Sequence, residues 1–573
     1  MGADSNKDIT DPDRGNIVIR AQNIDIDNVM DVYTNQSEQK FKQTGLTVSV
    51  SNSLVDNVNA IRDLEEAAGN TGSTRMKGIA AISGLLKAQA LAEQAQETLG
   101  SIQNGVGNTR IQATIGSQKS QSNSSSYTEK SQGSSIDTNN LALIATGAGS
   151  DSNININGSS LTVSNDALFQ ADNDLNVNGV AQNSNTRSNN KSSSTAIGGY
   201  ASFGQNTSAG ITASASRGKG HANSDSTTYA NSQINVGSTT TFDIGNDVNI
   251  KGGIINTNRA QGQIGGDVNI ESLQDTATYD SKQKNMGFSA DIDIAGGGAG
   301  SSLSVNGGKT DLNADYKGVG EQSGIFTGDG GIDLTAGGKT TLIGGAITTT
   351  DAALQAGLNN YVSKGGIETQ DINNTTSYDG NAIQAGLSLG DTTGKPQANL
   401  NGLGYGTDSD SDSSVTRAGI TGIAGSQDIT TDNRAEYAGI LKNSFNAGRV
   451  NEELGAQTQI TQEFGKEAPK AVAEFSQNRI NAIKANPDLS IDKKLTAIAK
   501  WDEGGIYRVA AHTALGALGT GSVEGTLTAG GVAAAAPTLN DVQAKLAKAL
   551  TDKGMNADIA NGTASGVISL TLL

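Results

Sequence analysis

A short phrase recurs along the middle of the chain: one or two small polar residues precede two aliphatic residues that flank one polar residue. Copies lie at residues 173–177 (NDLNV), 246–250 (NDVNI) and 266–270 (GDVNI), with a looser copy at 338–342 (GKTTL). The turn residues bend the chain, and the alternating pair buries one face of a very short strand. Because a unit of this size cannot form a core alone, copies must stack, which favours a β-solenoid.

The spacing of the aliphatic pairs predicts the shape of one coil. Neighbouring pairs lie about 7 residues apart, and equivalent positions such as Val248 and Val268 lie 20 apart. Three short strands in a coil of about 20 residues fit both spacings and predict a right-handed parallel β-helix. From about 106 to 400 this predicts at most about 15 coils in a rod of about 70 Å. The Ser/Asn/Gln-rich stretches 117–135 and 183–195 are expected to loop out.

Changes of period predict five parts. Residues 1–52 begin the β-solenoid, and aliphatic residues three and four apart predict a helical hairpin insertion over 53–104. Repeats continue the β-helix over 105–400, a Gly/Asp/Ser linker covers 401–433, and a helical, glycine-rich region covers 434–573. The hairpin is interpreted as a cap over an exposed solenoid end, with a partner-binding helix as the alternative.

The charge balance bears on the partners. The formal net charge is −18, with 58 acidic and 40 basic residues. Such a chain should avoid nucleic acid and anionic lipid unless a local basic patch compensates. The strongest candidate patch is 217–221 (RGKGH), which is short and diluted by glycine, so no nucleic-acid partner is predicted. The absence of cysteine excludes disulfides and thiolate chemistry, which suits a chain exported unfolded.

No motif for catalysis or metal binding is complete. The only histidines, His221 and His512, lie far apart in the sequence, and the acidic run 408–413 lacks the glycine and the acidic twelfth residue of a calcium loop. In the Gly-Lys-Thr at 338–340, Asp333 stands where a phosphate loop needs glycine. We predict no catalytic, cofactor-binding or metal-binding residue, and no enzyme.

One enzymatic alternative remains open. A β-helix that cleaves polysaccharide needs clustered carboxylates and usually aromatic platforms for sugar. The chain has a single tryptophan, Trp501, and it lies outside the predicted solenoid.

Residues 506–536 are nearly all small and apolar, with Arg508 and Glu524 as the only charged groups. The segment is long enough to span a bilayer, but its glycines weaken a helix and Glu524 would be costly in a membrane. It is interpreted either as a soluble glycine-rich helical hairpin or as a segment that contacts a membrane during delivery. The amino terminus lacks the basic and apolar parts of a signal peptide, and both ends look cut from a longer sequence.

Several stretches carry a family resemblance. Residues 265–283 (GGDVNIESLQDTATYDSKQ) and 212–220 (TASASRGKG) resemble the haemagglutinin repeat of filamentous-haemagglutinin-like exoproteins. Residues 451–465 and 501–512 (WDEGGIYRVAAH) resemble the pretoxin region of contact-dependent growth inhibition exoproteins. The secretion domain of that family, its Val-Glu-Asn-Asn junction and a toxin are not found in this sequence.

The resemblance implies two-partner secretion through an outer-membrane transporter of a Gram-negative bacterium. The protein is then expected to be secreted or held at the cell surface, to meet a receptor on a target cell, and to carry a toxin at its carboxyl end. The expected function is a non-catalytic, adhesin-type scaffold for toxin delivery. An adhesin without toxin cargo and a truncated remnant of such a gene are the alternatives.

Overall fold

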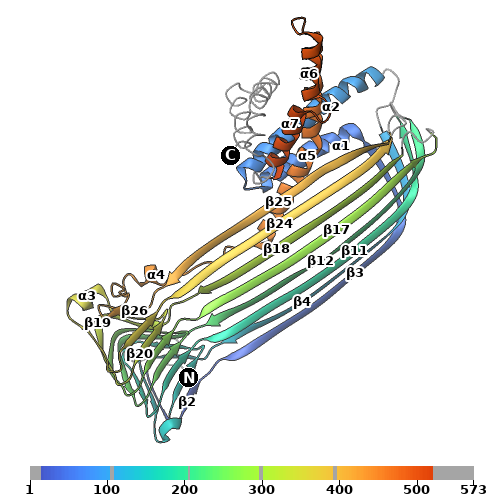
Figure 1. Cartoon of the computed structure of the whole chain (residues 1–573). Helices are drawn as coiled ribbons and strands as arrows, with labels where there is room; N and C mark the ends of the chain where they lie inside the picture. Colours follow the sequence, from blue (N-terminus) through green and yellow to red (C-terminus); the bar gives the residue numbers. More distant parts are fainter. Residues whose placement is uncertain (1–14, 103–108, 204–206, 296–300, 392–395, 521–573) are drawn as a thin grey trace.

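The computed structural model describes residues 15–102, 109–203, 207–295, 301–391 and 396–520. It is mainly β, with a small solenoid of parallel sheets at one end, a long antiparallel sheet and helices at the far end (Figure 1). The prediction of a mainly β, solenoid-type chain with helices in two places is confirmed at this level.

The recurring phrase forms one parallel sheet of the solenoid. In order across the sheet its strands are β2 (Ile24–Ile26), β7 (Ile154–Asn157), β10 (Leu175–Asn178), β14 (Val248–Lys251), β16 (Val268–Glu271), β20 (Thr340–Ile343) and β23 (Ile367–Gln370). The aliphatic residues stack in register and are buried: Leu175 lies beside Val248, and Val248 beside Val268.

A second sheet completes the solenoid walls. Its strands are β1 (Asn16–Ala21), β5 (Ser135–Thr138), β6 (Asn140–Ala145), β8 (Ser160–Val163), β9 (Ala167–Ala171), β13 (Ser232–Ile244), β15 (Gly253–Ile264), β19 (Gly324–Ala336), β21 (Ala346–Thr348), β22 (Asn359–Ser363), β26 (Gly419–Ile420) and β27 (Ala424–Gly425). Apart from the antiparallel pair β26 and β27, neighbouring strands are parallel.

The asparagine and aspartate residues of the recurring phrase make different hydrogen bonds. The central asparagines form a ladder on the outside, in which Asn249 donates to Asn176 at 3.0 Å and Asn269 donates to Asn249 at 2.9 Å. The aspartate before each strand accepts a backbone N–H from the next coil, as Asp247 does from the N–H of Asp267 at 2.7 Å. Side chains therefore bond successive coils outside the apolar core.

We expect Asn249→Asp to destabilise the solenoid by about 1 kcal/mol at about pH 7. A carboxylate still accepts from Asn269 but cannot donate to Asn176, and protonation in acid restores a donor. The cost should therefore shrink at about pH 3 relative to the unchanged chain, measured by denaturant unfolding at both pH values. An equal cost at both would argue against a donating role for Asn249.

The long sheet is the main departure from the predicted rod. Its strands run antiparallel, in the order β25 (Pro396–Thr416), β24 (Ile372–Asp391), β18 (Ser302–Val319), β17 (Gln274–Asp293), β12 (Ser208–Ala230), β11 (Val180–Phe203), β4 (Thr109–Gln132) and β3 (Val29–Asn52). Successive pairs of long strands leave the solenoid and return to it as arms (Figure 1).

Three expectations are wrong for this reason. The sheet of recurring phrases has seven strands, so the solenoid is about 30 Å long rather than about 70 Å. The stretches 117–135 and 183–195 do leave the solenoid, but they form paired strands and not loops, because 117–132 belongs to β4 and 183–195 to β11. The expected linker 401–433 contains regular structure as well. Most of β25 and the short strands β26 and β27 lie within it, and α4 (Arg434–Tyr437) follows directly after it. Backbone hydrogen bonds across the sheet hold these polar strands without an apolar face.

Helices lie where the aliphatic period predicted them, at the far end of the long sheet. They are α1 (Ser53–Asn70) and α2 (Thr74–Ile102), which connect β3 to β4, and α5 (Ala447–Ala485), α6 (Ile491–Trp501) and α7 (Ile506–Thr520). The hairpin α1–α2 packs on α5 through Leu64, Met76 and Ile79 against Ile460 and Phe464. It caps the far end of the arms rather than an end of the solenoid. Short turns of helix form α3 (Asp351–Gln355) and a 3₁₀ segment (Gly149–Asp151).

Candidate functional site

The two faces of the long sheet differ in what covers them. On one face, Val450 and Leu454 of α5 pack against Leu312, Tyr378 and Ala382. On the opposite face, which we call the open face, the large side chains of the outer half of the arms are exposed to solvent. The open face is therefore available for contact with another molecule.

Five lysines stand in one row across the open face. Lys191 of β11 lies directly opposite Lys219 of β12, Lys219 opposite Lys284 of β17, and Lys284 opposite Lys309 of β18. On the other side Lys191 faces Gln121, which faces Lys40 of β3. Two residues further along the strands, on the same face, lie Lys42, Lys119 and Arg217. We call these eight residues the basic belt, and all eight are exposed.

Most of the belt has no internal countercharge. Lys40 pairs with Glu38 at 2.8 Å, and Lys309 pairs with Asp311. Within the described ranges, the other six form no ion pair with another residue. Like charges directly opposite one another destabilise a sheet, so this row lowers the stability of the fold and concentrates positive potential on the open face.

The belt corrects the prediction that no basic patch compensates the negative charge. The segment 217–221 supplies only Arg217 and Lys219, and the other belt residues come from five other strands. Their sequence separation hides the belt. The signal that reveals it is the strand register, which needs the arms to be recognised first.

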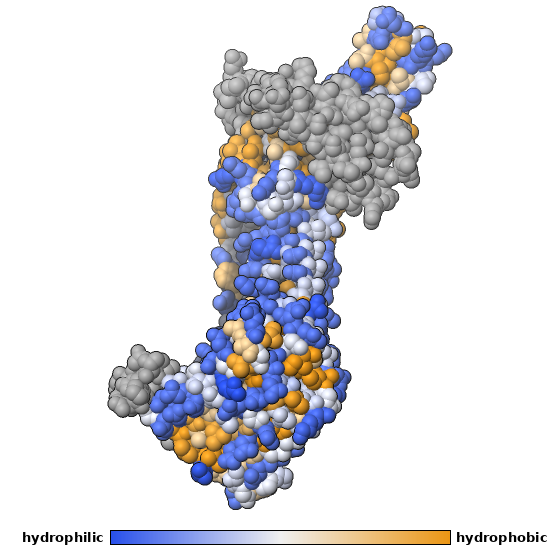
Figure 2. Space-filling model, turned by 90° about the vertical axis from the view of Figure 1, so that its left-hand side faces the viewer, coloured by the Kyte–Doolittle hydropathy of each residue, from blue (hydrophilic) through white to orange (hydrophobic). Residues whose placement is uncertain are grey.

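Beyond the belt, toward the helices, the open face is apolar. One cross-strand row holds Leu46, Ile115 and Ile197, exposed by 68%, 62% and 62%. Further large apolar side chains exposed on the same face are Val48, Val50, Ile111, Phe203, Ile211, Met286, Phe288, Ile292, Ile294, Leu303, Val305, Ile383, Leu387, Leu389 and Leu403. Figure 2 shows apolar residues on the shaft near its helical end and hydrophilic residues along its middle.

The apolar end is large for an exposed surface. Eight residues separate Lys42 from Val50, which is about 27 Å along the strand, and eight strands span about 34 Å. The outline of this end is about 900 Å² and includes polar positions such as Thr44 and Ser117 beside the apolar ones, whereas the largest apolar patch of an ordinary soluble monomer covers about 300–600 Å². A surface of this kind marks a site of contact with a protein or a membrane.

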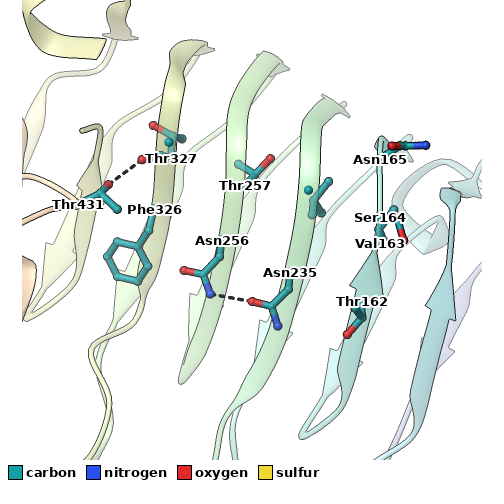
Figure 3. A pocket seen from close by; sticks show the side chains of 13 residues that line it. Thr162, Val163, Ser164, Asn165, Asn235, Asn256, Thr257, Phe326, Thr327 and Thr431 are labelled. Carbon is teal, nitrogen blue, oxygen red and sulfur yellow. Dashed lines mark hydrogen bonds between the residues drawn. The ribbon is translucent and has the colours of Figure 1, made fainter. Parts of the chain in front are cut away.

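A groove on the solenoid is less suited to chemistry (Figure 3). It encloses about 590 Å³ and is lined by Thr, Asn, Ser, Val and Gly residues with Phe326, without a titratable side chain. Asn256 donates to Asn235 at 2.9 Å, and the Thr431 hydroxyl donates to the Thr327 carbonyl at 2.7 Å. These groups can hydrogen-bond a ligand, but they contain no acid–base pair for hydrolysis.

The structure places the residues weighed for chemistry on separate elements. His221 on β12 bonds Asp280 at 2.8 Å, which lowers the pKa of that carboxyl, whereas His512 lies on α7, where burial lowers its pKa. The acidic run 408–413 lies within extended β25, where Asp408 pairs with Arg449 at 3.0 Å. Within the residues that the structure describes, no group of three or more His, Asp or Glu side chains is arranged to hold a metal ion.

Of the segment 506–536, the described residues form α7, and 521–536 lie outside the described residues. In the described part of the chain, no helix is both long and apolar enough to cross a membrane.

The comparisons relate part of this chain to haemagglutinin-repeat proteins. Residues 115–286, which include β11, β12, β16 and most of β4, match the family model described as hemagglutinin repeat. No solved structure matches the chain.

Relatives specify the class further. A tRNA nuclease CdiA of Yersinia mollaretii is 29% identical over 77% of this chain and 15% of its own length. A deoxyribonuclease CdiA of Yersinia pseudotuberculosis is 30% identical over 61% of this chain and 32% of its own, and a toxin CdiA of Yersinia pestis is 30% identical over 61% and 10%. The predicted resemblance to filamentous-haemagglutinin-like, contact-dependent growth inhibition exoproteins is thereby confirmed. The chain spans less than a third of the length of these relatives.

Proposed function

We propose that this chain is a scaffold segment of a contact-dependent growth inhibition exoprotein, non-catalytic in itself. It acts at the surface of a Gram-negative bacterium or after secretion through an outer-membrane two-partner-secretion transporter. The proposal includes a right-handed coil for the solenoid, a pretoxin region in the helical part after residue 433, and a receptor on the target cell.

The names of the relatives support a non-catalytic role. The matched stretches each cover more than 60% of this chain and must overlap, yet the names specify a tRNA nuclease, a deoxyribonuclease and a 16S rRNA endonuclease. Because the named activity varies while the overlapping part is shared, the shared part does not determine the activity. A scaffold common to several cargoes explains this pattern.

The open face gives the scaffold a way to contact the target cell. Its basic belt suits phosphate groups at the surface of an anionic membrane, where each lysine contributes about 1 kcal/mol. Its apolar end suits the boundary of the acyl chains just beyond those groups. The observation that carries this assignment is the shared register of the lysine row and the apolar rows on one face.

We expect the chain to bind vesicles of phosphatidylcholine with phosphatidylglycerol and to bind vesicles of phosphatidylcholine alone much more weakly. Changing Lys191, Lys219 and Lys284 together to glutamate should abolish binding to the anionic vesicles, because it reverses the charge of the belt. The measurement is co-sedimentation at low and high salt, which should show screening of the belt.

The matched control changes three exposed lysines outside the long sheet, Lys364, Lys442 and Lys493, to glutamate. This variant has the same net charge and should bind nearly as well as the unchanged chain. Equal loss in both variants, or equal binding to neutral vesicles, would reject the open face as an anionic-membrane site.

An adhesin without toxin cargo remains the second candidate, because the same face would serve simple adhesion. The DNA next to the gene separates the two. A toxin sequence and a small immunity gene downstream would favour delivery, and unrelated neighbouring genes would favour an adhesin or a remnant.

A further inference from the structure

Four cations of the basic belt form a compact cluster on internal strands of the long sheet. Lys219 of β12 lies directly opposite Lys191 of β11 on one side and Lys284 of β17 on the other, and Arg217 lies two residues from Lys219 on the same face. Directly opposed residues of antiparallel strands lie about 4.5–5.5 Å apart between Cα atoms, and residues two apart along a strand lie about 7 Å apart. The Cα atoms of this cluster therefore all lie within about 10 Å of one another.

No carboxylate lies beside the cluster to neutralise it. Within the residues that the structure describes, none of its four members forms an ion pair, whereas the next lysine of the row, Lys309, pairs with Asp311. β11 contains no acidic residue, and Asp280 on the same face of β17 is four residues from Lys284 and bonds His221 at 2.8 Å. A bound anion would therefore offset the repulsion among the four cations.

The number and spacing of the cations bear on which anion fits. A phosphodiester group carries one negative charge, so a single group neutralises only part of the cluster. Two phosphates on one molecule suit the cluster better than two separate lipids, because binding the first brings the second to the site at a high effective concentration. Two separate lipids must each be drawn from the membrane plane at an entropic cost of their own.

Apolar side chains begin directly beside the cluster. Met286 lies opposite Arg217, Phe288 lies two residues beyond Met286, and they are exposed by 61% and 43%. Ile197 of β11, exposed by 62%, continues the apolar surface toward the helices. A lipid whose phosphates lie on the cluster can place the first carbons of its acyl chains on these side chains, whereas a free phosphate gains nothing from them.

We propose that the cluster of Lys191, Lys219, Lys284 and Arg217 binds a membrane lipid that carries two phosphate groups on one molecule. The three lysines surround the two phosphates, and the planar guanidinium of Arg217 donates two hydrogen bonds to one of them. The acyl chains lie on the adjacent apolar side chains. The inference rests on the proposed function, since it specifies which lipid the open face prefers within an anionic membrane.

Cardiolipin is the probe, because it consists of two phosphatidyl groups joined by one glycerol. Vesicles of phosphatidylcholine with cardiolipin are compared with vesicles that contain twice as many molecules of phosphatidylglycerol, so that phosphate charge and acyl-chain content are equal. We expect about tenfold tighter binding to the cardiolipin vesicles in co-sedimentation, since only the linkage of the phosphates differs. Equal binding would overturn the inference and leave the proposed function standing, whereas binding to neither kind of vesicle would reject both.

Moving one charge out of the cluster separates the effect of clustering from that of total charge. The double variant Lys219→Thr/Thr278→Lys keeps the composition and the net charge, and its new lysine stands on the open face, because Thr278 is exposed on β17 an even number of residues from Lys284. These six residues correspond to about 20 Å. The variant should lose most of the preference for cardiolipin while still binding phosphatidylglycerol vesicles.

The matched control moves a lysine that lies outside the cluster. Lys309→Thr/Thr278→Lys removes a belt lysine that already pairs with Asp311, so it should keep the preference for cardiolipin. Circular dichroism establishes that both variants fold. A preference that survives in the Lys219 variant, or that is lost equally in both variants, would show that the cluster does not select the lipid and would overturn the inference.

A soluble diphosphate distinguishes a lipid site from a general phosphate site. Pyrophosphate at the same molar concentration as cardiolipin should not release the chain from the vesicles, because it has no acyl chain to contact Met286 and Phe288. Release at that concentration would show that the cluster takes a free diphosphate at least as well, and would overturn the assignment to a lipid.

Discussion

Phe242→Ala is expected to lower the free energy of unfolding of the solenoid by about 3–5 kcal/mol. Phe242 of β13 is 1% exposed and stacks on the buried ring of Phe169 of β9, with centroids 6.0 Å apart. Hydrogen-bonded coils hold both neighbours in place, so the site cannot collapse onto the space that the ring leaves. Both the transfer energy and the cavity therefore add to the cost.

The effect of Phe242→Ala should be local to the solenoid. Hydrogen exchange of amides in β9, β13 and β15, measured alongside guanidinium unfolding, should report the loss there first. Phe288→Ala, in a residue that is 43% exposed on the open face, is the matched control and should cost less than about 0.5 kcal/mol. Similar costs for the two variants would mean that Phe169 and Phe242 do not form a rigid core.

Lys87→Met is expected to weaken the attachment of the α1–α2 hairpin to α5 by about 3–5 kcal/mol. The ammonium of Lys87, whose side chain is only 7% exposed, lies 2.7 Å from the Glu463 carboxylate and 3.4 Å from that of Glu467. Removing the ammonium group leaves the carboxylates of Glu463 and Glu467 largely buried without this cation. The free-energy cost of that loss is larger than the stabilisation that an ion pair gives at a solvent-exposed position. Lys470→Met is the control, because Lys470 reaches Glu467 from an exposed position.

The same contact should depend on pH. Burial by itself raises the pKa of Glu463, but hydrogen bonds and charges from Lys466 and Lys87 outweigh it and leave the pKa lowered. A carboxyl whose pKa is lowered by folding stabilises the folded state at pH values above its ordinary pKa. This stabilisation is lost as the pH falls through the lowered pKa of the folded state. Burial lowers the pKa of Lys87, but Glu463 and Glu467 together outweigh burial and leave this pKa raised. The stabilisation from Lys87 is therefore present at pH values below its ordinary pKa and is lost in strong alkali.

Hydrogen exchange in α2 measures both effects of Lys87. In the unchanged chain, protection of α2 should fall in acid, whereas in Lys87→Met it should be low already at neutral pH and change less. Unchanged protection at neutral pH would show that the apolar contacts among Leu64, Met76, Ile460 and Phe464 hold the hairpin without the ion pair.

The solenoid can be predicted from the sequence because each coil repeats a short pattern of neighbouring residues. Val248 and Val268 point inward, and Asn249 and Asp247 bond the next coil, so each residue of the phrase has a function visible from its neighbours. The helices are equally local, since Leu64, Ile79 and Phe464 follow the helical period.

The arms could not be predicted by the same means. Much of β11, such as 183–195, has both faces in solvent or half-buried, so no alternation of apolar and polar residues marks it as a strand. The basic belt depends in turn on those strands: Lys191, Lys219 and Lys284 are scattered in the sequence and become neighbours only through pairing. Long-range backbone pairing leaves little trace in any one segment.

The continuous pairing of the arms fixes the face on which each of their side chains lies. A single residue inserted into one arm would turn every side chain beyond it to the opposite face, moving lysines and aliphatic residues off the open face. Among the described residues of the long sheet there is one such irregularity, between β24 and β25 near Ala385 and Leu387, in the outermost pair of the sheet. The strands of the sheet range from 18 to 24 residues, so a strand can differ from its neighbours at its outer end. Within the paired part, an insertion keeps the side chains beyond it on their own face only in steps of two residues.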